Sequence, residues 1–163
     1  GEVEIFDSTQ IFEYLEDSRP TPPLWPITAP ERAEARRLEH CSDEVFFPHV
    51  IRLMGMRGKP DPIESHGWIE SRNGINSYYS SMERQLADRL YVAKTFSYAD
   101  IAFYMAQFFA ARHTIPITTN HPHLLAWRGR MFERPAVGKV ITAMGAYLES
   151  RGALVPPFGR ETT

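Results

Sequence analysis

Two adjacent polar residues near the start of the chain, Asp7 and Ser8, have the types and spacing of a helix N-terminus, where a serine hydroxyl and free amides can hold a small carboxylate. They precede an apolar pattern of Ile11, Phe12 and Leu15 that predicts a short helix with its N-terminus at this pair. The first amides of a helix have no acceptor within the helix, and the helix dipole is positive there. An amide N–H beside a serine hydroxyl therefore suits a carboxylate, while the plainer interpretation is a helix cap worth about 1 kcal/mol.

Other candidates for chemistry are weaker. His121 and His123 flank Pro122, a spacing that can bind a metal, but without a further ligand nearby in sequence a helix start is the better interpretation and we expect no metal. Cys41 is the only cysteine, so an internal disulfide is excluded and a reducing compartment, the cytoplasm, is favoured. It falls on an apolar stripe and is expected to be an inert thiol.

Composition excludes two classes of partner. Eighteen Lys and Arg residues against twenty Asp and Glu give a net charge of −2, which provides no field for binding nucleic acid or an anionic membrane. Every apolar run is broken well before the roughly 20 residues that span a bilayer. The alternating charges from Glu31 to Glu39 are typical of a solvated helix face.

The elements that must position Asp7 and Ser8 are short. Residues 1–6 predict a strand, and a strand plus a two-turn helix buries too little surface to fold alone, so we expect further structure to cover them. The prolines of residues 18–30 predict an extended linker. Leu24 and Trp25 within it should pack between two bodies, because exposing them to water is unfavourable.

From residue 31 onward the pattern is helical. Pro48 should interrupt the first long helix, and a second helix is predicted to start with Asp61 as its cap, followed by Pro62 and Glu64. A later segment from Ser97 is apolar on all sides, which predicts a helix at the centre of a bundle. Further helices should start at Pro122 and Pro135, with Gly152 ending the last one.

The start of the central helix has its own signature. Ser97 and Asp100 can form a capping box, in which each side chain accepts from the other residue's amide, with Phe96 and Ile101 as the flanking hydrophobic staple. We assign this group a structural role, because the mutual bonds use the atoms that chemistry would need. Loss of the box in Asp100→Ala is expected to cost on the order of 1 kcal/mol.

Four segments of the chain resemble segments of the glutathione S-transferase family, and they occur along the chain in the family's order. Residues 96–102, Phe-Ser-Tyr-Ala-Asp-Ile-Ala, are similar to the box and staple that open its central helix. Residues 30–36 resemble the start of its first long helix after the linker, and residues 134–137 resemble its penultimate turn. Residues 7–15 resemble the last helix of its thioredoxin-like domain. The implied fold is an all-α, C-terminal-like helical bundle with a small strand-plus-helix remnant of a thioredoxin-like α/β domain.

The resemblance also implies a domain division and a ligand. Residues 1–17 would be the remnant, 18–30 the interdomain linker and 31–163 the helical domain. Ser8 would hold the γ-glutamyl carboxylate of the co-substrate glutathione, and Asp7, where the family usually has Glu, would attract its ammonium group. The residue that activates the thiol and the cis-proline of the family belong to segments that these 163 residues do not include, so no catalytic residue is named.

The family's pocket for a hydrophobic electrophile would be lined by the bent end of the first long helix and by the central helix. Plain core or dimer packing is the competing interpretation for each of these residues. Asp43 could reach the ammonium group of glutathione bound by a neighbouring subunit. The simpler interpretation is a solvated surface charge. The pocket candidates are Phe46, His49, Val50, Arg52, Leu53, Tyr104 and Phe108.

The implied activity of the parent protein is addition of the glutathione thiolate to a hydrophobic electrophile by a cytoplasmic homodimer, with this chain inactive alone. Two alternatives remain open at this point. One is a non-catalytic assembly module, a role that such helical domains also have, and the other is a glutathione-dependent isomerase of the same family. Retention of Asp7 and Ser8 favours the glutathione-dependent readings.

Overall fold

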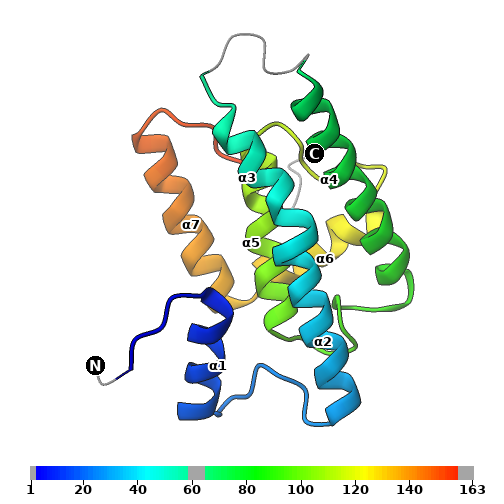
Figure 1. Cartoon of the computed structure of the whole chain (residues 1–163), viewed down its shortest axis with the longest axis vertical. Helices are drawn as coiled ribbons and strands as arrows, with labels where there is room; N and C mark the ends of the chain where they lie inside the picture. Colours follow the sequence, from blue (N-terminus) through cyan, green and yellow to red (C-terminus); the bar gives the residue numbers. More distant parts are fainter. Residues whose placement is uncertain (1–2, 59–64, 158–163) are drawn as a thin grey trace.

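The residues described by the computed structural model, 3–58 and 65–157, form seven α-helices (Figure 1). The all-α class predicted from the sequence is confirmed. The helices are α1 (Ser8–Ser18), α2 (Ala29–Cys41), α3 (Phe47–Gly55), α4 (His66–Gln85), α5 (Tyr98–Arg112), α6 (Pro122–Phe132) and α7 (Pro135–Ser150); η1 (Ser42–Phe46) is a π-helical turn and η3 (Leu86–Asp88) a 3₁₀ turn.

The predicted N-terminal strand is wrong for the part that the structure describes. Residues 3–6 have no regular structure, and Phe6 is 85% exposed. A strand needs a neighbour to accept its backbone hydrogen bonds, and the described residues include no other strand. The predicted helix start at Asp61, Pro62 and Glu64 lies outside the described residues, and the described α4 has Ser65 as its N-cap.

The first long helix is interrupted where Pro48 predicted an irregularity. α2, η1 and α3 follow one another without a loop, and the Phe47 amide at the end of η1 donates to the Ser42 carbonyl, five residues back. Pro48, in the first turn of α3, has no N–H to donate, and in a regular helix its ring would clash with the carbonyl one turn back, so the wider turn before it relieves that clash. The combined rod runs along the length of the bundle (Figure 1).

Helix α5 lies at the centre, as its apolar sequence predicted. It contacts α2, η1, α3 and α6. Phe103, 1% exposed, contacts the rings of Phe46 and Trp127 with centroid separations of 5.5 and 5.1 Å. Aromatic burial of this kind contributes a large share of the hydrophobic free energy of a small bundle.

Helix α1 is held to the bundle by aromatic rings. Phe12 stacks on Tyr98 of α5 at a centroid separation of 3.8 Å, and Trp25 of the linker meets both rings edge-on at 5.1 and 5.7 Å. The Glu16 carboxylate accepts from the amides of Leu24 and Trp25 at 2.9 and 3.1 Å. Trp25 is 4% exposed, which confirms that it packs between two parts of the chain.

A close contact between α3 and α4 gives a test of the packing. A Cβ at Gly74 would lie 2.2 Å from Nε2 of His49, whose ring is half-buried against α4. We expect Gly74→Ala to lower the free energy of unfolding by about 1–2 kcal/mol, because the clash outweighs the better helix propensity of alanine. Gly55→Ala is the control, since nothing lies within 4 Å of a Cβ there. Urea unfolding of both variants measures the difference, and equal stability would contradict the contact.

Candidate functional site

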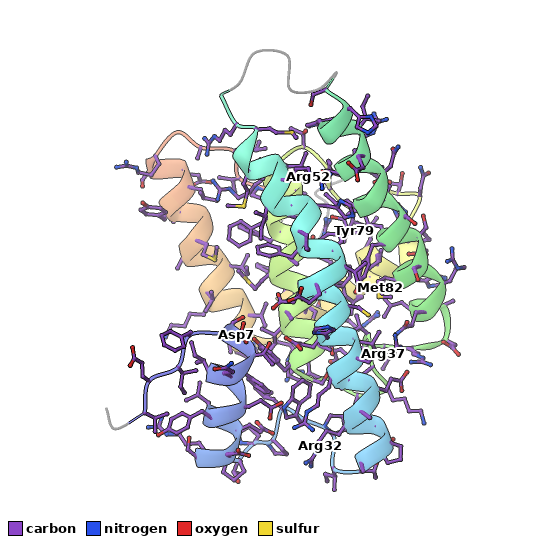
Figure 2. All side chains as sticks on the ribbon, viewed as in Figure 1. Asp7, Arg32, Arg37, Arg52, Tyr79 and Met82 are labelled. Atoms are coloured by element: carbon purple, nitrogen blue, oxygen red, sulfur yellow. The ribbon has the colours of Figure 1, made fainter. Side chains whose placement is uncertain are left out.

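The N-terminus of α1 faces the start of α5 and the junction of α2 with η1. Figure 2 shows Asp7 at this end of α1, beside the bundle. Three carboxyl groups and a tyrosine hydroxyl interact electrostatically here, contributed by the N-cap of α1 and by α2, η1 and α5. These groups are Asp7, Glu39, Asp43 and Tyr98, with the Ser8 hydroxyl beside them.

Asp7 is the N-cap of α1. Its backbone is extended, with φ −106° and ψ 143°, and Oδ1 accepts from the amides of Thr9 and Gln10 at 2.9 and 3.2 Å. The Ser8 amide has no acceptor among the residues that the structure describes. The cap therefore leaves one amide at the positive end of the helix available, next to the exposed Ser8 hydroxyl.

Glu39 and Asp43 make the surroundings of Asp7 acidic. Glu39 is 4% exposed and accepts from the Thr9 hydroxyl at 2.8 Å. The pKa of Glu39 and that of Asp43 are both raised, first by burial and then by neighbouring carboxylates that include Asp7. An ammonium group placed among these carboxyls would be favoured, since it would offset their mutual repulsion.

Tyr98 contributes a neutral hydroxyl. Its pKa is raised to about 12 by burial and by the charges of Glu39 and Asp43, while a hydrogen bond with Ser8 acts in the opposite direction. The phenol is therefore protonated at physiological pH and serves as a hydrogen-bonding group rather than a base. Its hydrogen bond with Ser8 links the start of α1 to the start of α5.

Sequence reasoning missed Glu39 and Tyr98 as parts of this site. The interpretation of Glu39 as part of a solvated face is wrong, because it is nearly fully buried. The signal was its spacing: it lies four residues after the buried Ala35 and four before Asp43, so all three share one face of the rod. Asp43 is half-buried near Asp7 of its own chain.

The capping box of α5 is present, and Asp100 does more than cap. Its Oδ2 accepts from the Ser97 amide at 3.0 Å, while Oδ1 accepts from the Val92 amide and from Nε1 of Trp127, each at 2.9 Å. The Asp100 amide in turn donates to the Ser97 carbonyl oxygen at 3.1 Å. The carboxyl is fully buried, and burial raises its pKa to about 6 despite these bonds.

The staple residues connect two of the segments that the sequence singled out. Phe96 and Ile101 are both half-buried against the core. The guanidinium carbon of Arg134 lies 3.3 Å from the Phe96 ring centroid, and Tyr91 meets the same ring edge-on. The turn before α7 is thus packed directly on the start of α5.

The seven candidates for an electrophile pocket do not come together in one place. Arg52 is exposed and ion-paired with Glu70, and His49 packs against Gly74. Leu53 lines a cavity at one end of the bundle, whereas Tyr104 lines a different one between α5 and α7. The remaining three, Phe46, Val50 and Phe108, are core residues at most 2% exposed.

An apolar cleft follows α5 and α7. A cavity of about 410 Å³ lies near the start of both helices and one of about 590 Å³ lies further along, with Val140 shared by the two. The first cavity begins at Ile101, one helical turn after Tyr98 of the acidic site. Its lining residues are Ile101, Tyr104, Met105, Met131, Ala136, Val137, Val140 and Ile141.

The two histidines that suggested a metal are used structurally. The amides of His123 and Leu124 donate to the Glu83 carboxylate at 3.0 and 2.9 Å, which caps the start of α6. Within residues 3–58 and 65–157, no group of three or more His, Cys, Asp or Glu side chains is arranged for a metal ion. None of the described helices has the length and apolar character required to cross a bilayer.

Comparison with known proteins agrees with the fold and with the motifs. Residues 69–135 match the family model described as the glutathione S-transferase C-terminal domain. A search of curated protein sequences finds no match. Solved structures of glutathione S-transferases share the fold, and the chain spans about two thirds of their length or less.

Three of these structures illustrate the likeness. A glutathione S-transferase domain-containing protein of Marinobacter aquaeolei is 25% identical, with a TM-score of 0.71 over 82% of this chain and 68% of that one. A beta class enzyme of Sphingomonas chungbukensis is 23% identical, with a TM-score of 0.72 over 86% and 68%. A Burkholderia graminis glutathione transferase, which holds two glutathione molecules per subunit, is 22% identical, with a TM-score of 0.70 over 84% and 59%.

The bundle, its central capped helix and the matched segment define a glutathione transferase-type helical domain. Residues 69–135 match the glutathione S-transferase C-terminal domain, and the described bundle shares the fold of solved glutathione S-transferases.

Proposed function

We propose that this chain is part of a glutathione S-transferase and binds the γ-glutamyl end of glutathione at the start of α1. The observation that carries the proposal is the pairing of an available helix amide at Ser8 with an acidic neighbourhood made by Asp7, Glu39 and Asp43. A γ-glutamyl group carries one carboxylate and one ammonium group on the same carbon. The amide and hydroxyl suit the first, and the carboxyls suit the second.

The electrophile in this proposal occupies the apolar cleft between α5 and α7. The cleft begins at Ile101, a turn away from Tyr98, so a molecule held there is close to one held at Ser8. Holding two reactants side by side removes much of the entropic cost of their encounter. Of the seven candidates from the sequence, Tyr104 belongs to this cleft, and we propose packing roles for Phe46, Val50 and Phe108.

The chemistry is addition of the glutathione thiolate to a hydrophobic electrophile, a detoxification reaction. The thiol must ionise, and hydrogen bonds to the thiolate lower its pKa. The residues to which the family resemblance assigns that task are not among these 163, so we expect this chain alone to bind glutathione without conjugating it.

Further parts of the proposal concern the domain division, the oligomeric state and the location. Residues 1–17 end a thioredoxin-like domain, 18–30 are the linker and 31–163 are the helical domain. The protein is a homodimer. Its location is the cytoplasm, in keeping with the half-buried, unpaired thiol of Cys41.

Calorimetric titration of the chain with glutathione tests the binding step. Ser8→Ala is expected to weaken binding about tenfold, because a charge-assisted hydrogen bond to the carboxylate is lost. Ser18→Ala is the matched control at the other end of the same helix, where the hydroxyl donates to the Leu15 carbonyl, and it should leave the affinity unchanged.

Two fragments of glutathione identify which end is bound. γ-Glutamylcysteine carries the γ-glutamyl group and should compete with glutathione, whereas cysteinylglycine lacks it and should not. Equal competition by the two fragments, or equal effects of the two serine substitutions, would refute the proposed site.

A further inference from the structure

The ring of Tyr98, the first residue of α5, is fixed by its neighbours. It lies parallel to the Phe12 ring of α1, with an interplanar angle of 4° and a centroid separation of 3.8 Å. Trp25 of the linker meets the Tyr98 ring edge-on, and the Tyr98 amide donates to the Leu24 carbonyl at 3.1 Å. The ring is thus restrained by α1 and by the linker as well as by its own helix, so its hydroxyl has little freedom to move.

The hydroxyl of this ring lies at the N-terminus of α1. Ser8 precedes Phe12 by four residues, which places Ser8 one turn earlier on the same face of the helix. A ring stacked on Phe12 can therefore reach Ser8 with its hydroxyl, and the Tyr98 and Ser8 side chains are hydrogen-bonded. Ser8 is exposed, whereas Tyr98 is half-buried. The pair connects a fixed group of the bundle with a serine that faces solvent.

The charged groups around the Tyr98 hydroxyl are acidic. Burial has the largest effect in raising its pKa, and the carboxylates of Glu39 from α2, Asp43 from η1 and Asp7 from the N-cap of α1 raise it further. Two of these carboxylates already have donors, because Glu39 accepts from the Thr9 hydroxyl at 2.8 Å and Asp7 accepts from the Thr9 amide at 2.9 Å. The phenol stays protonated at physiological pH, so it keeps a hydrogen to donate.

The hydrogen bond between these two hydroxyls leaves one hydrogen for a further partner. A phenol is a stronger acid than an aliphatic alcohol and is therefore the better donor of the two. When Tyr98 donates to Oγ of Ser8, the serine hydrogen is left to point toward an incoming carboxylate. A hydroxyl that accepts one hydrogen bond also becomes a stronger donor in the next one.

We propose that Tyr98 is a positioning residue for glutathione, which donates to Ser8 and thereby turns the Ser8 hydroxyl toward the γ-glutamyl carboxylate. The inference rests on the proposed function, because it concerns the same binding site. It adds that a residue of α5, acting through Ser8 without touching the ligand, contributes to the affinity for the carboxylate.

The link between the two hydroxyls is tested first without glutathione. Carbon NMR of protein labelled at the ζ carbon of tyrosine reports the hydrogen bonding of the Tyr98 hydroxyl, and Tyr98→Phe assigns the resonance by its loss. Ser8→Ala is expected to shift this resonance, whereas Ser18→Ala, at the other end of α1, should leave it unchanged. Equal shifts in the two serine variants, or none in either, would overturn the inference whether or not glutathione binds.

Calorimetric titration with glutathione then measures the effect on the ligand. Tyr98→Phe keeps the stacked ring but loses the hydroxyl, and it should weaken binding about threefold to fivefold. Tyr14→Phe is the matched control, because it removes an exposed hydroxyl from α1, and it should bind as the unaltered chain does. In the Ser8→Ala background, Tyr98→Phe should have no further effect, because the hydroxyl that it would orient is absent.

The outcomes separate this inference from the function on which it rests. An effect of Tyr98→Phe that is undiminished in the Ser8→Ala background would mean that Tyr98 acts by some route other than Ser8, and it would overturn the inference. A loss of affinity in Ser8→Ala with none in Tyr98→Phe would overturn it as well, while leaving the proposed function intact. No binding of glutathione by the unaltered chain would refute both.

Discussion

Asp100→Ala is expected to lower the free energy of unfolding by about 3 kcal/mol or more, well above the cost of losing a helix cap alone. The reason is that three buried donors share this one carboxyl: the amides of Val92 and Ser97 and the indole N–H of Trp127. Alanine leaves all three without an acceptor in the core. Each costs about 1 kcal/mol or more when stranded away from water.

Thermal unfolding measures this effect. A loss of 3 kcal/mol should lower Tm by about 10 °C in a domain of this size. Asp88→Ala is the control. The Asp88 side chain is 84% exposed and its ion pair with Arg89 is long, at 3.7 Å, so its loss should change Tm little. A Tm for Asp100→Ala within a degree of the control would show that the three donors find other partners.

The pH dependence of stability separates the carboxyl charge from its hydrogen bonds. The folded-state pKa of Asp100 is raised to about 6 from 3.8, so the folded protein binds more protons than the unfolded chain between these values. Stability therefore falls as pH rises from about 4 to 6, by about 3 kcal/mol for a shift of about two units. Asp100→Ala should lack this fall, so its deficit against the unaltered protein should be larger at pH 4 than at pH 7.

Trp25→Ala is expected to release α1 from the bundle. The indole is 4% exposed and fills the corner between Phe12 and Tyr98, and truncation of a buried tryptophan typically costs 3–5 kcal/mol. The loss falls on α1 and the linker, because the other helices keep their own contacts with α5 or with one another. Asp7 and Ser8 should then lose their fixed position, and glutathione affinity should fall at least tenfold.

Hydrogen exchange distinguishes local release from general unfolding. Amides of α1 should exchange much faster in Trp25→Ala, whereas those in the middle of α5 should stay protected. Trp25→Phe, which keeps an aromatic ring between Phe12 and Tyr98, is the control. Its α1 amides should exchange at a rate between those of the unaltered protein and Trp25→Ala. Unchanged protection of α1 in Trp25→Ala would mean that Phe12 alone holds the helix.

The helices and their order could be predicted from the sequence because their signals are local. Pro122 and Pro135 each start a helix, and Gly152, with φ +60°, follows the last one. The capping residues Ser97 and Asp100 are three positions apart in the chain, so their interaction needed no knowledge of the fold. The strand predicted at residues 1–6 is wrong where the structure describes it, at residues 3–6, for the opposite reason, since a strand depends on a partner elsewhere.

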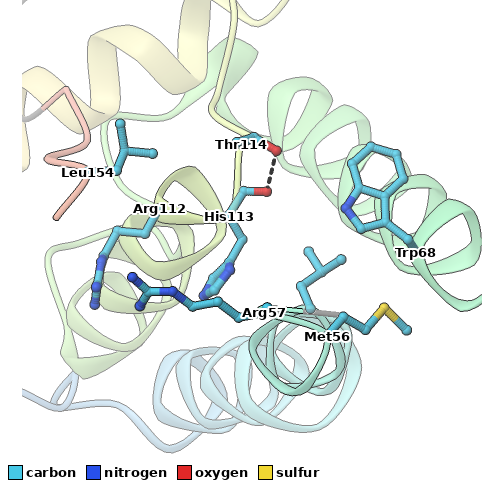
Figure 3. Close-up of a pocket in the computed structure, with 9 residues that line it drawn as sticks. Met56, Arg57, Trp68, Arg112, His113, Thr114 and Leu154 are labelled. Atoms are coloured by element: carbon cyan, nitrogen blue, oxygen red, sulfur yellow. Dashed lines mark hydrogen bonds between the residues drawn. The ribbon is translucent and has the colours of Figure 1, made fainter. Parts of the chain in front are cut away.

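The candidate sites depended on contacts that no local pattern shows. Trp127 lies 27 positions after Asp100, and nothing in either segment indicates that the indole donates to that carboxyl. Glu39 was predicted to be exposed because its neighbours in sequence are charged. It lies instead on the inner face of α2, where it accepts a hydrogen bond from Thr9. Arg57, in the turn after α3, and Arg112, at the end of α5, line one cavity although they are far apart in the sequence (Figure 3).

The extra residue in the π-helical turn Ser42–Phe46 changes the angular phase of the rod formed by α2 and α3. One added residue rotates everything beyond it by about 100° about the helix axis. The two parts of the rod therefore contact different helices. Helix α2 packs mainly on α5 and places Glu39 beside α1, while α3 packs mainly on α4. In a single uninterrupted helix the apolar stripe would stay on one side along the whole length. That stripe could not pack against both α5 and α4.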